Sequence, residues 1–69
     1  MNLERYLEKT RDAGESKDAR HTRFAKQLGV SLHTIRKWLN GQRRPNDRMK
    51  IKIQQASENK IRLADLVRD

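Results

Sequence analysis

Apolar residues recur at helical spacing in two short segments near the middle of the chain, with a glycine between them. The first segment presents one apolar face, formed by Phe24, Ala25 and Leu28. The second segment carries an apolar stripe, formed by Ile35, Trp38 and Leu39. Gly29 suits the end of the first helix because glycine tolerates a positive φ, and Ser31 suits the N-cap of the second. Because helices joined this tightly cross steeply, the pattern predicts a helix-turn-helix unit at about residues 20–40.

The same pattern predicts a helix at the start of the chain. Asn2 suits its N-cap and Gly14 its end. One face of this helix would carry Leu3, Tyr6, Leu7, Thr10 and Ala13. A polar connection follows at residues 15–20, where either Ser16 or Asp18 is suited to cap the second helix. We expect that helix to run to Leu28 and the third to span about residues 32–40.

Residues 47–56 fit two kinds of structure. Met49, Ile53 and Ala56 share one face of a helix, and Asp47 would lie near its N-terminus, where the helix dipole favours a negative charge. Alternation of Met49, Ile51 and Ile53 with lysines instead suits a strand. We favour the helix, because residues 54–56 continue it and no second strand is evident.

The end of the chain predicts a short closing segment. Asn59 suits a left-handed stop, Ile61 and Leu63 suit extended backbone, and Leu66 and Val67 suit a final turn. The elements together predict an all-α fold. We expect one compact domain of four to five helices over residues 1–69, with a possible short extended C-terminal segment.

Composition narrows the class of protein. The 69 residues include no cysteine, which excludes disulfides and thiolate metal sites and fits a reducing compartment. No apolar run approaches the roughly 20 residues that span a bilayer. We therefore expect a soluble, intracellular protein with no membrane partner.

The net charge of +8 is concentrated in the middle of the chain. Residues 16–52 hold eleven basic and two acidic side chains, whereas residues 1–15 and residues 53–69 are close to neutral. Such clustering indicates a polyanionic partner, since lysine and arginine release condensed counterions when they meet phosphates. An acidic membrane is disfavoured because no segment pairs a basic face with a broad aromatic or leucine face. Nucleic acid is the favoured partner.

Two segments carry a resemblance to a known family. FAKQLGVSLHTIRKWLNGQRRP, residues 24–45, and the tail SENKIRLADLVRD resemble the lambda-repressor-like helix-turn-helix family, within it small phage Cro and YdaS-type regulators. The resemblance covers more than half of the chain. It implies a transcriptional regulator, in most cases a repressor, that binds double-stranded operator DNA as a two-fold dimer with its third helix in the major groove. It also implies the cytoplasm of a bacterial or phage-infected host cell.

The resemblance assigns roles to particular positions. Base-edge contacts would come from Ser31, Leu32, His33, Thr34, Arg36 and Lys37. Phosphate contacts after the third helix would come from Asn40, Gln42, Arg43 and Arg44. Phosphate contacts on the other flank would come from Arg20, His21 and Arg23.

The chemistry of these residues supports the roles to differing degrees. Arg36 and Lys37 suit the guanine acceptors O6 and N7, and His33 can donate to the same atoms. Leu32 has two open interpretations, a core residue or a contact with a thymine methyl group. Trp38, on the apolar stripe, is interpreted as core.

Other functions have little support in the sequence. His21 and His33 lie on separate elements without an adjacent carboxylate pair, so we expect no enzyme, metal site, cofactor or small-molecule ligand. An alternative is an antitoxin-like or protein-interaction module whose main partner is another protein. Its interface would use the C-terminal cluster Ile61, Leu63, Leu66 and Val67. An RNA-binding domain is disfavoured, because the aromatic residues all suit the core and leave no stacking surface.

Overall fold

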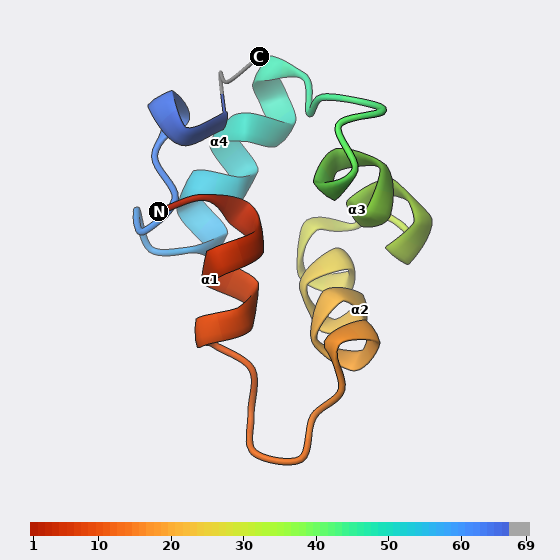
Figure 1. The fold of residues 1–69 in the computed structure, drawn as a ribbon. Coiled ribbons are helices and arrows are strands. Elements are labelled where there is room, and N and C mark those ends of the chain that lie inside the picture. The colour runs from red at the N-terminus through yellow and green to blue at the C-terminus, as the bar shows by residue number, and fades with distance from the viewer. Residues whose placement is uncertain (67–69) are drawn as a thin grey trace.

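The fold is built from four α-helices and one short 3₁₀ helix, seen here in a computed structural model that describes residues 1–66 (Figure 1). The elements in chain order are α1 (Leu3–Lys9), α2 (Lys17–Leu28), α3 (Leu32–Leu39), α4 (Asp47–Ala56) and η1 (Leu63–Leu66). Residues 1–66 contain no strand, so the helical interpretation of residues 47–56 is confirmed. The described part of the chain is therefore all-helical, as predicted.

Each α-helix begins at a polar cap within hydrogen-bonding distance of its first turn. The caps are Asn2, Ser16, Ser31 and Asn46, and each accepts a hydrogen bond from a backbone N–H three residues later. These side chains satisfy donors that a helix N-terminus otherwise leaves without a partner. Of the two caps expected for α2, Ser16 is the one observed, and the helix starts at residue 17.

Helix α2 lies against α1, α3 and α4, and α4 in turn packs on η1 (Figure 1). The core that these contacts enclose consists of Leu3, Tyr6, Leu7, Phe24, Ala25, Leu28, Ile35, Ile53 and Ile61. Phe24 has no exposed surface, and its ring meets that of Tyr6 at 5.9 Å between centroids in a tilted arrangement. Trp38 packs against this core and is partly buried, which agrees with its interpretation as a core residue.

The prediction that α1 continues through Ala13 to Gly14 is wrong. The helix ends at Lys9, and Ala13 is exposed. At this end the Tyr6 carbonyl accepts both the Thr10 N–H at 3.0 Å and the Thr10 hydroxyl at 2.7 Å. Gly14, with φ of +83°, lies in the turn that leads into α2.

The C-terminal segment also differs from the prediction. Leu63 begins η1 and is not extended, and Ile61 is fully buried in the core rather than part of an exposed interface. Asn59 does adopt a left-handed conformation, as does Glu58. Val67 lies outside the described residues.

Ser57 fastens this segment to the end of α4. Its buried hydroxyl donates to the Gln54 carbonyl and accepts the Ile61 N–H, both at 3.0 Å. The backbone N–H of Ile61, a fully buried residue, thus depends on the Ser57 side chain for its hydrogen-bond acceptor.

We expect Ser57→Ala to lower the free energy of unfolding by about 1–3 kcal/mol, because the buried Ile61 N–H loses its acceptor. Thr22→Ala is the matched control. The Thr22 hydroxyl donates to the Asp18 carbonyl at 2.7 Å near the surface and is not needed as an acceptor in the core. We expect a change within about 0.5 kcal/mol for that variant. Urea unfolding followed by circular dichroism measures both, and equal midpoints for the two variants would contradict this account.

Candidate nucleic-acid interface

Helix α3 divides into a buried and an exposed face. Ile35 has no exposed surface, whereas His33, Arg36 and Asn40 are exposed and Lys37 is half-buried. Helical geometry explains the division, since residues three and four apart share one side of the helix. Three of the six residues expected to approach bases, His33, Arg36 and Lys37, thus share the outer side of one short helix.

The turn before α3 is held at both ends. Gly29, in the left-handed conformation with φ of 78°, ends α2, and the Val30 N–H donates to the Ala25 carbonyl at 2.9 Å. Ser31 then caps α3 by accepting the Thr34 N–H at 3.2 Å, and the two hydroxyls lie 3.0 Å apart. The hydroxyl oxygens of Ser31 and Thr34 therefore already have partners within the turn.

The segment after α3 is exposed and basic. Gln42, Arg43 and Arg44 are exposed, and the N–H groups of Gln42 and Arg43 both donate to the Lys37 carbonyl, at 3.0 and 3.3 Å. Pro45 leads directly into the Asn46 cap of α4. The backbone of this segment is anchored at each end, so its side chains extend from a fixed base.

Leu32 and His21 are both half-buried. Leu32 thus keeps some exposed surface at the start of α3. Burial lowers the pKa of His21 below its usual 6.5, and the nearby carboxylate of Asp18 only partly opposes this. At neutral pH His21 is therefore uncharged and can donate a hydrogen bond without adding positive charge.

Arg20 is not a surface residue, which removes it from the predicted phosphate contacts. Its side chain is 4% exposed, and Nε and Nη2 donate to the Thr10 hydroxyl oxygen at 3.1 and 2.8 Å. The guanidinium lies 5.8 Å from the Tyr6 ring centroid and 5.7 Å from that of Phe24, within the range of cation–π attraction. Nη1 is buried without a hydrogen-bond partner. The side chain joins α1 to α2.

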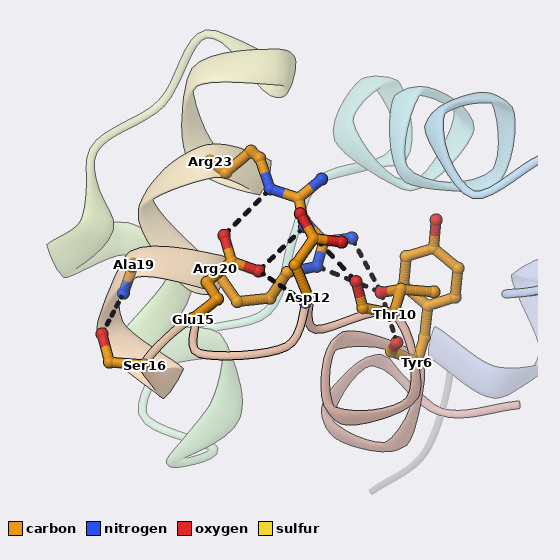
Figure 2. A network of polar contacts seen from close by, with 8 residues as sticks. All are labelled: Tyr6, Thr10, Asp12, Glu15, Ser16, Ala19, Arg20 and Arg23. Atoms are coloured by element: carbon orange, nitrogen blue, oxygen red, sulfur yellow. Dashed lines mark hydrogen bonds and ion pairs between the residues drawn. The ribbon is translucent and has the colours of Figure 1, made fainter.

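Arg23 is exposed but is held by the connection between α1 and α2 (Figure 2). Its Nε and Nη2 donate to the two carboxylate oxygens of Glu15 at 3.1 and 2.9 Å, and Nη2 also lies 3.6 Å from the Asp12 carboxylate. The Glu15 carboxylate further accepts the Asp12 N–H at 3.0 Å. This forked pair offsets the charge that was predicted to meet a phosphate.

Arg36 contacts α2 across the helix junction. Its Nη2 lies 3.0 Å from Oδ2 of Asp18, in the first turn of α2, and both side chains are at least half exposed. Sequence reasoning treated Asp18 only as a possible cap. No local signal marks the pair, because the two residues are distant in sequence and meet only through the packing of α3 on α2.

An open cleft of about 680 Å³ lies beside this pair, lined by residues of α1, α2 and α3. Its cations are Arg5, Lys17 and Arg36, and its carboxylates are Glu4, Glu8 and Asp18. The charges of these lining residues balance, so the cleft has no excess of positive charge. Within residues 1–66, no group of three or more His, Cys, Asp or Glu side chains is placed to hold a metal ion.

Comparison with protein-family models, with curated proteins and with solved structures found no match to this chain. Among the described residues, no helix is long and apolar enough to cross a membrane.

We expect Arg20→Ala to lower the free energy of unfolding by about 2 kcal/mol, since it removes the packing on two rings and both bonds to Thr10. Arg20→Met is the matched control. It keeps an unbranched chain against the rings and removes the unpartnered Nη1, so it should cost less. Urea unfolding compares the two variants, and an Arg20→Ala protein as stable as the wild type would refute the structural role.

Glu15 provides a pH test of the connection. The hydrogen bonds from Arg23, then that from the Asp12 N–H, lower the pKa of Glu15 from 4.5 to about 2. A carboxyl whose pKa is depressed in the folded state stabilises it above the unfolded pKa. That contribution should therefore be complete above about pH 4.5 and lost as the pH falls toward 2.

The carboxyl carbon of Glu15, followed by NMR, should titrate near pH 2 in the wild type and closer to 4.5 in Arg23→Gln. The difference in stability between the wild type and Glu15→Gln should also shrink as the pH falls through that range. A wild-type Glu15 that titrates near 4.5 would show that the pair does not form in solution.

Proposed function

We propose that this protein is a sequence-specific double-stranded DNA-binding transcriptional regulator. In this proposal α2 and α3 form a helix-turn-helix, and α3 enters the major groove. The observation that carries the proposal is the outer side of α3, where His33, Arg36 and Lys37 stand together while Ile35 anchors the opposite side in the core. Cationic and imidazole donors suit the guanine acceptors O6 and N7.

The segment after α3 supports the same proposal. Gln42 and Arg43 are exposed on an anchored backbone, next to the helix proposed to read bases. Phosphate contacts from such a position would fix the register of the helix on the duplex, while the base contacts supply the sequence preference. A loop whose only role is to keep the protein soluble would not have to lie beside α3.

The mode of action rests on the resemblance to the lambda-repressor-like family. We propose a two-fold dimer on a palindromic operator, acting as a phage Cro-type repressor. Dimers of this kind place two reading helices about one turn of DNA apart, which doubles the sequence that one short helix can read.

Selection from a random duplex library at near-physiological salt tests this function. We expect a short palindromic consensus, whose half-site spacing reports the dimer geometry. Enrichment of no sequence, together with binding that disappears as salt rises, would leave only non-specific attraction between a basic protein and DNA.

Two substitutions should distinguish residues that recognise bases from residues that bind phosphates. Lys37→Ala should reduce discrimination at one base pair of the consensus by about 1–3 kcal/mol. Arg43→Ala should weaken binding to all duplexes alike and lower the slope of log K against log salt by about 0.9, the value for one phosphate contact.

Arg11→Ala is the control for loss of one positive charge. Arg11 lies in the connection between α1 and α2, residues 10–16. In Figure 1 this connection and residues 41–46 are at opposite ends of the ribbon. This variant should change neither the sequence preference nor the salt slope. Equal effects of Lys37→Ala and Arg43→Ala on every sequence would contradict the division of roles.

A further inference from the structure

The pair formed by Asp18 and Arg36 joins the two helices of the proposed reading unit. The 3.0 Å contact runs from the first turn of α2 to the last turn of α3, on the outer side that also carries His33 and Lys37. Exposed ion pairs contribute little to folding stability. The main effect of this contact is therefore to fix the position of the Arg36 guanidinium.

Asp18 is itself firmly placed. Ser16 caps α2 through the Ala19 N–H at 3.0 Å, and the Asp18 carbonyl accepts the Thr22 hydroxyl at 2.7 Å. A carboxylate in the first turn of a helix is also favoured by the helix dipole. The acceptor that holds Arg36 thus stands on a fixed backbone, and the pair restricts a side chain that otherwise samples many rotamers.

The guanidinium retains donors for a second partner. Arginine carries five N–H donors in a planar fork, and the contact with Asp18 engages Nη2. The remaining edges can donate to base or phosphate acceptors. A side chain already oriented loses less entropy on binding, and a fork held in one plane matches a base edge better than a freely rotating cation.

The carboxylate also acts on the DNA. The carboxylate of Asp18 repels phosphates and so lowers the affinity for every duplex. Only a duplex with the correct base offsets this repulsion, through a contact with the oriented guanidinium of Arg36. Lower affinity for wrong partners is one way to obtain specificity.

We propose that Asp18 is a specificity-determining positioning residue, which holds Arg36 across the junction of α2 and α3 in the orientation that reads a base. This inference rests on the proposed DNA-binding function and adds to it a residue outside α3. Arg36 makes the contact with the base, and Asp18 acts through Arg36.

The test is a double-mutant cycle on the specificity ratio, the affinity for the selected consensus duplex divided by that for a scrambled duplex at the same salt. The variants are Asp18→Asn, Arg36→Ala and the combination of both. Asp47→Asn is the matched control, because Asp47 also lies in the first turn of a helix but pairs with Lys50 of its own helix at 3.7 Å.

Asp18→Asn should lower the specificity ratio by about five- to thirty-fold, in the range of coupling between contacting residues. In the Arg36→Ala background the same change should leave the ratio unaltered. Asp18→Asn and Asp47→Asn each remove a negative charge, so each should tighten binding to scrambled DNA. Asp47→Asn should nevertheless leave the ratio at the wild-type value, because it should tighten binding to the consensus duplex equally. In the free protein, the NMR signal of the Arg36 Nε–H should show greater mobility in Asp18→Asn but not in Asp47→Asn.

Two results would overturn the inference while the proposed function stands. In one, Asp18→Asn and Asp47→Asn keep the same ratio as the wild type. In the other, Asp18→Asn lowers the ratio equally with and without Arg36. If the wild type itself selects no consensus, the proposed function fails, and the inference fails with it.

Discussion

Burial of one face of α2 is the constraint on which the rest of the structure depends. In a chain of 69 residues little apolar surface can be buried, and α2 shares its face with α1, α3 and α4. Phe24, on this face, has no exposed surface, and its ring lies against that of Tyr6 on α1. Because α3 packs on the same helix, through Ile35, the direction of its outer side follows from this arrangement. The eight residues of α3 present a fixed outer side because α2 supports them from behind.

The same packing decides how much positive charge faces solvent. Arg20 lies in the core against two aromatic rings, and the charge of Arg23 is offset by Glu15. The excess of basic residues in positions 16–52 therefore overstates the charge available to a partner. Part of the excess holds α1 against α2, and the rest is spread over α2, α3, the segment after α3 and α4. Charge counted along a sequence is thus an upper limit on charge presented by a surface.

Structural features that depend on residues close in sequence were predictable, and features that depend on contacts between distant residues were not. The caps at Asn2 and Ser31 and the left-handed Gly29 followed from local chemistry, since each bonds to backbone close by in sequence. The end of α1 did not, because Thr10 ends it in contact with Arg20, a residue of the next helix. Charged side chains are mostly exposed, so Arg20 was assigned to the surface, although its spacing of four residues from Phe24 places it on the buried face of α2. The same is true of the candidate interface. Helical spacing predicts which residues share a side of α3, but it does not predict that Arg36 forms an ion pair with α2.

The two carboxylates of the basic region show why this limit matters for function. A surface made only of cations attracts all phosphates alike, because counterion release carries no information about sequence. An acidic residue on such a surface lowers general affinity, so its presence needs a compensating role. Asp47 pairs with Lys50 within α4 and leaves α3 untouched, whereas Asp18 spans the junction between α2 and α3. Under the proposed function, the charge that weakens non-specific attraction is also the charge that orients the arginine. If α3 reads DNA, sequence preference comes from the packing of two helices as well as from the residues of one.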